Sequence, residues 1–596
     1  MKTRFPSHRL AVPLAAIALA ASNAHAATQG PAGMAFYTPP AVITGNHGDL
    51  ISYRSTTVSL GTDAPAVNAW NVMYRSTDSR GAANVVTGTV LVPKGIWLSL
   101  TARPIVSYAV GTHGLAQSCA PSLQMAAGTD YENANIVAAL KAGYAVLVSD
   151  YQGYTNGATP TYLAGASQGN AVLDIVTAAQ KIPFGGLSTN AKVAVWGYSQ
   201  GGQSAAWAGQ LQPTYAPNIK LVGVAAGGVP GDFKRTARFL DGSAGSGFMF
   251  GGVIGLAQQY PDKIPLDTLA SETGKAAINQ GKQQCVFESM FTFMNHELSE
   301  YTVNNRSLES LMTVPSINEA LTAQDLGGNT ITAPLYQYHG QADEFIPLDQ
   351  ALALKKKYCA RATSVTFDLF PSEHIATQFQ GAPYVLSWVA DRIAGKTAAP
   401  NNCGNNGPEP QSTANPGGGN FVVSLKEWGL NATVGLKTLK QTVTLPATST
   451  FTADADITAG RLNGALSVPD FKQTLSIIGI PANVGLRITP VGSATGTVSL
   501  DNSGILRIKG TAYADITVTS VLGLPFGECK TVTPVAFPID FQGPVSSMGN
   551  GKLVFTGTTT FPQIKGCAIS AILSTMMSGS GQTYSFTVSP PAPKRF

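Results

Sequence analysis

The chain changes in character close to residue 400 of its 596 residues. Upstream of that point, apolar strand-like runs alternate with helical patterns, as in the strand-like run 104–110, the helical segment 135–143 and the strand-like run 144–149. Repeated alternation of strand and helix predicts a parallel sheet that is covered by helices on both faces. We therefore expect residues 27–400 to form one α/β domain.

The rest of the chain lacks this alternation. Residues 401–420 are rich in Asn, Pro, Gly and Ser, a composition that is typical of linkers. Residues 421–596 contain short runs rich in Val, Thr and Ile between Gly, Asn and Pro turns, such as 441–445 and 584–588. This pattern predicts an all-β, sandwich-like C-terminal domain.

Residues 1–26 are interpreted as a signal peptide. Three basic residues are followed by the apolar stretch Leu10 to Ala21 and by the small-x-small cleavage site Ala24-His25-Ala26. That stretch is short for a membrane span, and no later segment offers about 18 unbroken apolar residues. The sequence thus predicts a secreted protein, extracellular or periplasmic, without a transmembrane anchor.

The charge balance argues against a nucleic-acid partner. The leader holds three of the 38 basic residues and none of the 33 acidic ones, so the mature chain has a net charge of +2. The basic cluster Lys355-Lys356-Lys357 lies in a helical pattern and is interpreted as a solvated helix face. We therefore expect no nucleic acid among the partners of this protein.

An even number of cysteines in an exported chain predicts a set of disulfides. The six that remain after removal of the leader are Cys119, Cys285, Cys359, Cys403, Cys529 and Cys567. No two of them have CxxC spacing, which argues against a metal site, and we expect no metal ion. If pairs form within domains, Cys529 joins Cys567, and the other four pair within the first domain in an order that their spacing leaves open.

Two Gly-x-Ser-x-Gly pentapeptides compete as the site of a nucleophilic serine: Gly165–Gly169 around Ser167, and Gly197–Gly201 around Ser199. A nucleophile elbow follows a sheet strand and opens a helix, which lifts the serine hydroxyl above the sheet. Ser199 follows an apolar strand-like run and precedes a helical segment, whereas Ser167 lies at the expected start of the helix 171–180. We therefore predict Ser199 as the nucleophile.

A catalytic serine needs a base to remove its proton and an acid to orient that base. The strand-like segment 334–340 leads into a loop with Asp343 and Glu344, and the next strand-like segment leads to His374. Serine, acid and histidine then follow in the order of α/β-hydrolases. We predict Asp343 as the acid, in preference to Glu344, and His374 as the base. His339 closes the first of these strands and is expected to be packed or hydrogen-bonded.

Acyl transfer also needs backbone N–H groups that stabilise an oxyanion. The first donor is predicted to be the amide of Gln200, directly after the nucleophile. The second is expected from the loop Gly111-Thr112-His113-Gly114, whose glycines let the backbone approach the substrate. Thr112 and His113 remain alternative donors, and a plain Gly-rich turn is the alternative interpretation of the loop.

In combination, these motifs resemble the secretory lipase family, which is typified by fungal lipase A and is shared by many secreted bacterial esterases. The resemblance covers roughly residues 35–400. The chain departs from it in two respects. Val110-Gly111 stands where bacterial relatives often carry a His-Gly pair, and residues 421–596 lie outside the resemblance, which implies nothing about their role. The matching blocks are Gly111–Gly114 with Ser118–Ser122, Val195–Gly202, Gly340–Pro347 and the Glu373-His374 loop.

The resemblance implies an α/β-hydrolase that cleaves carboxylic esters without a metal or organic cofactor. It also implies a helical cap inserted at about residues 233–330. The apolar run 243–256 within that cap suits either a mobile cover over an acyl pocket or static core. Family-like pairing would join Cys119 to Cys285 and Cys359 to Cys403.

The leading hypothesis is a secreted serine carboxylic ester hydrolase, a lipase or esterase that cleaves lipid or other hydrophobic esters through an acyl-enzyme on Ser199. One alternative is a polyester hydrolase or acyltransferase whose C-terminal domain binds a surface or a polymer. Another alternative is a non-catalytic surface-binding protein built on an inactive hydrolase scaffold.

Overall fold

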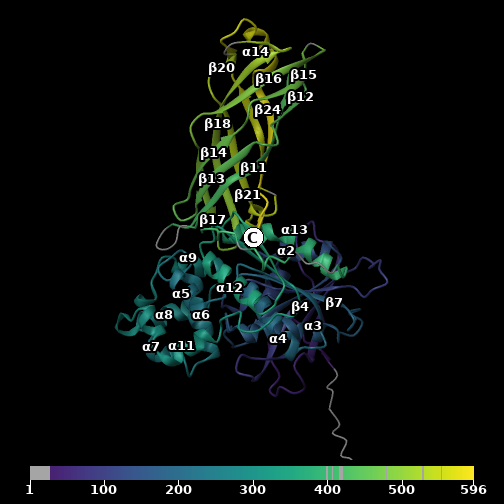
Figure 1. Cartoon of the computed structure of the whole chain (residues 1–596), viewed down its shortest axis with the longest axis vertical. Coiled ribbons are helices and arrows are strands. Elements are labelled where there is room, and N and C mark those ends of the chain that lie inside the picture. Colours follow the sequence, from purple (N-terminus) through teal and green to yellow (C-terminus); the bar gives the residue numbers. More distant parts are fainter. Residues whose placement is uncertain are drawn as a thin grey trace, which may run out of the picture.

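A computed structural model describes residues 27–396, 401–405, 407–414, 420–477, 479–526, 529–551 and 553–596. The chain forms a broad α/β body and an elongated β-domain that stands on it (Figure 1). The expected signal peptide, residues 1–26, lies outside the described residues, as do parts of the expected linker. Within the described ranges, no helix combines the length and the apolarity that a bilayer span requires.

The body is built on an 11-stranded sheet with the order β1-β2-β3-β4-β6-β5-β7-β8-β9-β10-β25. Neighbouring strands run parallel from β6 through β5 to β10, and antiparallel among β2, β3 and β4. Every residue of β5, β9 and β10 is buried, as expected for strands with helices on both faces. The predicted α/β architecture is confirmed. The strands are β1 (Thr28–Gln29), β2 (Leu50–Ser55), β3 (Val67–Thr77), β4 (Ala83–Pro93), β5 (Ile105–Ala109), β6 (Ala145–Gln152), β7 (Lys192–Tyr198), β8 (Lys220–Gly227), β9 (Leu335–Gly340), β10 (Val365–Phe370) and β25 (Lys594–Arg595).

The strand order reverses at β5. The chain passes from β5 to β6 on one side, and then from β6 across to β7 on the other side. Because parallel crossovers are right-handed, these two steps put the helices α2 and α3 on opposite faces of the sheet. α2 packs with α13 on one face, and α3 packs with α4 on the other. A crevice opens at the carboxyl ends of the strands around such a reversal. The helices are α1 (Pro121–Ala127), α2 (Asn133–Lys141), α3 (Gly165–Ala179), α4 (Gln200–Tyr215), α12 (Leu348–Ala360) and α13 (His374–Ile393).

A set of short helices is inserted between β8 and β9 and forms a cap on the body (Figure 1). The apolar run 243–256 lies mostly in α6, and most of its side chains are buried. A Cβ on Gly255 would lie 2.4 Å from the backbone nitrogen of Tyr162, so the helix packs closely against the body. In this structure the run is buried against the body, and Phe248, Phe250 and Leu256 from it line a cavity between the body and the cap. The cap helices are α5 (Phe233–Leu240), α6 (Ser246–Gln259), α7 (Leu266–Leu269), α8 (Glu272–Gly281), α9 (Val286–Phe293), α10 (Leu308–Met312) and α11 (Pro315–Thr322).

The β-domain is a 14-stranded antiparallel sheet. It curls until β21 and β22 meet, where the Thr559 hydroxyl donates to the carbonyl of Ala536. Buried and exposed residues alternate along β13 and β22, so one side of the sheet forms an apolar interior. The prediction of an all-β domain is confirmed, although the helix α14 (Ser570–Met577) was not expected. The strands are β11 (Val422–Leu436), β12 (Gln441–Thr444), β13 (Thr450–Asp456), β14 (Arg461–Ser467), β15 (Phe471–Ile477), β16 (Ile480–Pro490), β17 (Ala494–Leu500), β18 (Ile505–Val521), β19 (Leu524–Pro525), β20 (Lys530–Thr531), β21 (Val535–Pro544), β22 (Leu553–Phe561), β23 (Ile564–Lys565) and β24 (Gly579–Ser589).

The last residues of the chain return to the body. β25 pairs with β10 and thereby adds an antiparallel strand to the edge of the first sheet. Arg595 donates to the buried carboxylate of Asp368 over 2.7 Å, and the Phe596 ring packs on Phe367. Lys355 donates to the carbonyl oxygen of Phe596 over 3.0 Å and is only 6% exposed. The interpretation of the lysine cluster as a solvated helix face is therefore wrong for Lys355, because the chain terminus covers it.

The three disulfides join the pairs that were expected. Cys119–Cys285 connects the body to the cap, and Cys359–Cys403 ties the start of the linker to α12. Cys529–Cys567 lies within the β-domain. The linker also bonds to the body directly, because the backbone nitrogen of Thr413 donates to the Gln341 carbonyl over 2.9 Å.

Candidate active site

Ser199 lies in the turn between β7 and α4, at the carboxyl edge of the sheet. Its backbone has φ 57° and ψ −122°, a conformation that residues other than glycine rarely adopt. The flanking glycines allow a very close approach of the chain. A Cβ on Gly197 would lie 2.1 Å from the Gly201 carbonyl oxygen, and a Cβ on Gly201 would lie 1.9 Å from the carbonyl oxygen of Ala109. The pentapeptide thus forms the strained strand-to-helix turn of a nucleophile elbow.

Ser167, in the competing pentapeptide, has a different environment. It lies inside α3, which begins at Gly165, and it is fully buried. Its hydroxyl donates a 2.7 Å hydrogen bond to the side-chain oxygen of Gln152. The hydroxyl is therefore bonded to an amide in a regular helix, and no elbow is formed there.

Asp343 and His374 come together at the same edge. Asp343 lies in the loop after β9, and His374 is the first residue of α13, directly after β10. The ring Nδ1 of His374 lies 2.7 Å from Oδ2 of Asp343, and both side chains are buried. The other carboxylate oxygen of Asp343 accepts from the backbone nitrogens of Phe345 and Ile346, over 3.0 and 2.7 Å. These bonds hold the carboxylate in one orientation toward the imidazole.

The electrostatic environment keeps Asp343 ionised. Burial alone would raise the pKa of this carboxyl, but the nearby His374 and His339 and the hydrogen bonds that it accepts outweigh burial and hold the pKa below its usual value. His339 is fully buried, and its Nε2 lies 2.9 Å from the Ile346 carbonyl. Burial lowers the pKa of His339, which is therefore a neutral, hydrogen-bonded support of the loop that holds Asp343. That matches its sequence-based interpretation.

Two further carboxyls surround this pair, and sequence reasoning assigned neither of them a supporting role. Glu344 accepts from the backbone nitrogen of His374 over 3.1 Å, so it contacts the main chain rather than the ring. Glu373 is the N-cap of α13 and accepts from the nitrogens of Ile375 and Ala376 over 2.6 and 2.7 Å. Burial raises the pKa of Glu373 to about 7. Burial and the neighbouring carboxylates also raise the pKa of Glu344 well above its usual range. The cap position of Glu373 was readable from its place directly before a helical run.

The loop 111–114 follows β5 and faces this edge. Thr112 Oγ1 lies 2.7 Å from the hydroxyl of Tyr162. His113 is turned inward, with Nδ1 3.0 Å from the Gly111 carbonyl and Nε2 3.3 Å from Asp130. Burial alone would lower the pKa of His113, but the carboxylates of Asp130 and Glu132 raise it to about 9. The side chain of His113 is thus a charged anchor beneath the loop.

Glu132 is a second support of this loop that sequence reasoning missed. Its carboxylate accepts from the backbone nitrogen of Gly111 over 2.6 Å and from the Tyr108 hydroxyl over 2.5 Å. Glu132 is fully buried, so these bonds fix the point at which β5 passes into the loop. No local sequence pattern marks this residue, because its partners are about 20 positions away in the chain.

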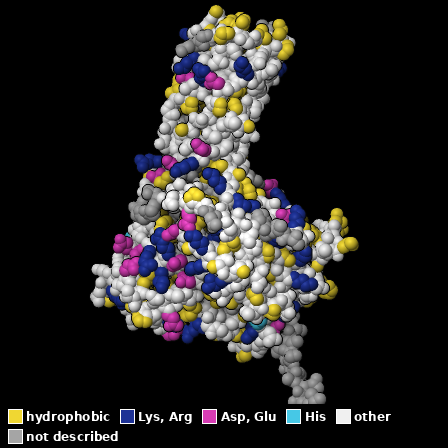
Figure 2. Space-filling model, in the orientation of Figure 1, with side chains coloured by type: hydrophobic (Ala, Val, Ile, Leu, Met, Phe, Trp, Pro, Cys, Tyr) yellow, Lys and Arg dark blue, Asp and Glu magenta, His cyan; other side chains and the backbone are white. Residues whose placement is uncertain are grey.

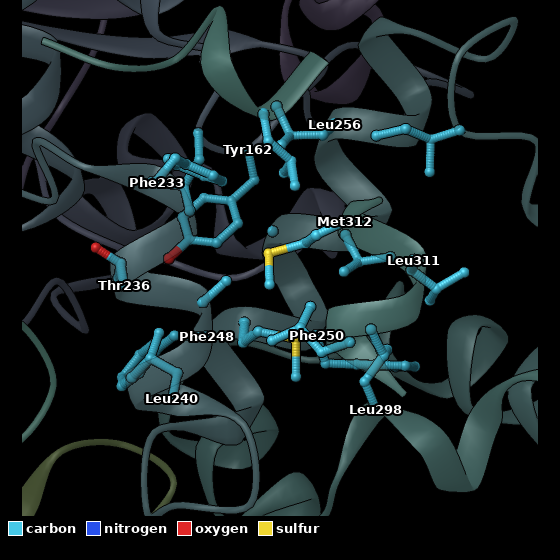
Figure 3. Close-up of a pocket in the computed structure, with 18 of the residues that line it drawn as sticks. Tyr162, Phe233, Thr236, Leu240, Phe248, Phe250, Leu256, Leu298, Leu311 and Met312 are labelled. Carbon is cyan, nitrogen blue, oxygen red and sulfur yellow. The ribbon is translucent and has the colours of Figure 1, made fainter. Parts of the chain in front are cut away.

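A cavity of about 120 Å³ is lined by Ser199, Gln200 and His374 at the body and by the cap. Figure 3 shows that aromatic and aliphatic side chains from several cap helices converge on it. Thr236 and the hydroxyl of Tyr162 are polar exceptions within this lining. An apolar cavity beside a candidate nucleophile suits a hydrophobic acyl chain. Among the cap side chains that line it are Phe233, Leu240, Phe248, Phe250, Leu256, Leu298, Leu311 and Met312.

Sequence comparisons agree with this geometry. A model of the family described as "Secretory lipase" matches residues 120–401, a range that ends before the β-domain. Lipase 10 of Candida albicans is 33% identical over 398 residues, which are 63% of this chain and 83% of that protein. Lipase A of Moesziomyces aphidis is 28% identical over 406 residues, 65% of this chain and 85% of that protein.

Solved structures show the same fold. The closed state of Candida antarctica lipase A aligns with a TM-score of 0.57 and 26% identity, covering 64% of this chain and 90% of that one. The esterase LipA of Xanthomonas oryzae, described as degrading rice cell walls, aligns with a TM-score of 0.50 and 18% identity, over 59% of this chain and all of that one. The chain therefore belongs to the secretory lipase family and is a carboxylic ester hydrolase of the lipase and esterase type that acts on hydrophobic esters.

Proposed function

We propose that this protein is an exported serine lipase or esterase that works through an acyl-enzyme on Ser199. The observation that supports this most directly is a shared cavity. Ser199 in its strained elbow and His374, which is hydrogen-bonded to Asp343, both line one apolar cavity beneath the cap. Nucleophile, base and acid are the parts that serine-dependent acyl transfer needs.

The first half of the reaction follows from this arrangement. Asp343 holds the Nδ1 side of the His374 ring, which leaves Nε2 to accept the proton of the Ser199 hydroxyl. The serine oxygen then attacks the ester carbonyl carbon. The backbone N–H of Gln200 and one from the loop 111–114 stabilise the oxyanion. We assign the second donor to Thr112, because its hydroxyl contacts the cavity-lining Tyr162 while the His113 side chain points into the body.

The second half returns the enzyme to its starting state. Protonated His374 gives its proton to the departing alcohol, and the acyl group remains on Ser199 with its chain in the cavity. A water molecule, deprotonated by His374, then attacks the acyl carbon. The bond between this carbon and the Ser199 oxygen breaks, His374 returns the proton to the serine oxygen, and the carboxylic acid is released. The apolar lining from the cap favours hydrophobic acyl chains, since each methylene that leaves water contributes about 0.8 kcal/mol of binding.

Two serines in equivalent motifs offer a matched test. Ser199→Ala should abolish turnover of p-nitrophenyl butyrate and labelling by a fluorophosphonate probe. Ser167→Ala should keep both, since its hydroxyl is bonded to Gln152 in a helix. Loss of labelling in the Ser167 variant, or its survival in the Ser199 variant, would overturn the assignment.

Export is proposed from the leader at residues 1–26 and from three disulfides, which persist in oxidising compartments. Expression with the native leader in a bacterial host should yield a periplasmic or extracellular product whose first residue is Ala27. An uncleaved product that begins at Met1 would refute this reading of the leader.

A further inference from the structure

The end of the β-domain that points away from the body carries exposed aliphatic side chains. Figure 1 places α14, β15, β16 and β20 at this end, and Figure 2 shows hydrophobic side chains over it. We define the tip as the described residues of the segments 437–440, 477–482, 515–534 and 562–581, which leaves out residues 478, 527 and 528. Its most exposed large hydrophobic residues are Ile480 (63%), Leu522 (62%), Leu524 (63%), Val532 (47%) and Ile572 (52%).

The backbone of the tip does not explain these side chains. Val521 pairs with Leu524, so Leu522 and Gly523 form a two-residue hairpin turn with φ of 53° and 82°. Such turns favour Asn, Asp or Gly at the first position, because a left-handed backbone is unfavourable for most side chains. A leucine there is both strained and exposed to solvent. Its presence therefore points to a contact outside the chain.

The tip is also held firmly in place. Cys529–Cys567 joins two of its segments, and β20 pairs with β23 next to this disulfide. In α14 the side chain of Leu573 is buried, while that of its neighbour Ile572 faces outward. The exposed residues are thus displayed on a rigid support rather than on chain ends.

The charges of the tip are mainly positive. In the sequence its four segments hold four lysines and two acidic residues. One of the acids, Asp515, lies 2.7 Å from Lys530 and is paired with it. Lys437, Lys440 and Lys565 are exposed around the same end. Cations that surround protruding aliphatic side chains are the pattern of proteins that bind anionic membrane surfaces.

We propose that this tip docks on a lipid surface with anionic headgroups. The aliphatic side chains enter the boundary between headgroups and acyl chains, and the lysines contact the phosphates. A protein partner would favour aromatic and arginine anchors, whereas the most exposed large side chains of this tip are aliphatic. Because the body lies at the opposite end of the β-domain, this contact anchors the enzyme and keeps the cavity beside Ser199 away from the lipid surface (Figure 1).

The hydrophobic arm of the test uses sedimentation with vesicles of phosphatidylcholine and phosphatidylglycerol. The variant with Leu522→Asn, Leu524→Ser and Ile572→Ser should lose binding at least about tenfold, since burial of each large aliphatic side chain is worth more than that factor in favourable cases. Leu522→Asn suits the turn, so the variant should stay folded. The matched control, Tyr513→Ser with Val554→Ser, removes exposed hydrophobic residues outside the tip and should bind as the parent does.

The charge arm replaces lysines. Lys437→Gln, Lys440→Gln and Lys565→Gln together should weaken binding about a hundredfold, because each lysine near an anionic leaflet contributes about a fivefold gain. Lys426→Gln with Lys509→Gln, outside the tip, serves as the matched control. Equal binding to vesicles of pure phosphatidylcholine would overturn the anionic requirement. Absence of vesicle binding, or equal loss in the control variants, would overturn the proposal itself.

The docking proposal and the catalytic proposal can fail separately. All the tip variants should hydrolyse soluble p-nitrophenyl butyrate at the parental rate, which also reports that the body is folded. Conversely, Ser199→Ala should bind vesicles as the parent does. Retention of the parent protein on an insoluble polyester, but not on vesicles, would identify a polymer as the occupant and refute the lipid surface.

Discussion

Replacement of Phe421 tests whether the β-domain contributes to the catalytic geometry. Phe421 is the residue before β11 and is 1% exposed. Its ring lies 5.6 Å from the ring of Phe345, which lies 5.4 Å from the imidazole of His374. Phe345 also donates its backbone N–H to Asp343. A side chain of the β-domain thus supports Phe345, the residue that contacts both Asp343 and His374.

The expected magnitude has two parts. Phe421→Ala removes a buried phenylalanine, which should lower the free energy of unfolding by about 3–5 kcal/mol. The contact between the rings of Phe421 and Phe345 is worth about 1 kcal/mol. If its loss raises the activation free energy at His374 by the same amount, kcat should fall about fivefold. Phe421→Leu keeps most of the buried volume but no ring, so it should cost less than about 1.5 kcal/mol of stability and still lower kcat.

The assay is kcat and KM for p-nitrophenyl butyrate, measured beside urea unfolding. Phe537→Ala is the matched control, since Phe537 is buried in the β-domain among other aromatic rings of that domain. It should lose comparable stability with kcat unchanged. Parental kcat in both Phe421 variants would refute the coupling. Equal losses of kcat in the Phe421 and Phe537 variants would show that general loosening, rather than this contact, is responsible.

Three further predictions concern stability. Arg595→Ala should lower the free energy of unfolding by about 1–2 kcal/mol, because it leaves the buried carboxylate of Asp368 without its ion pair. Urea titration measures this loss, and an unchanged unfolding midpoint would contradict the prediction. The raised pKa of Glu373, about 7 against 4.5, implies a stabilising contribution that is complete below about pH 4.5 and is lost as the pH rises to about 7. Glu373→Gln should therefore flatten the dependence of Tm on pH in this window, and an identical profile would refute the assignment. Replacement of Cys119 and Cys285 by alanine should lower the free energy of unfolding by up to about 5 kcal/mol, because their disulfide closes a loop with a sequence separation of 166. Thermal unfolding under non-reducing conditions measures this loss.

Much of the site was predictable because its signals are local. The strand, the tight turn and the helix around Ser199 follow one another in the sequence, so their pattern distinguishes it from Ser167. The order of Ser199, Asp343 and His374 can likewise be read from the sequence. The parallel sheet then brings the three residues to one edge, because each of them follows a parallel strand. The local patterns also separated the α/β part from the all-β part, whereas the cap between two strands was implied by the resemblance to the secretory lipase family.

The remaining features depend on contacts between distant residues. The sequence alone determined the fold class, the candidate nucleophile, acid and base, and the division near residue 400, because periodicity and turn chemistry act over a few neighbouring residues. Only the tertiary structure decided that Glu132 fixes the loop 111–114 and that β25 completes the sheet beside β10. It also decided that the β-domain contacts the loop after β9, which holds Asp343, through Phe421. Such contacts arise from the packing of surfaces that are built from separate segments, and no local pattern encodes which surfaces meet.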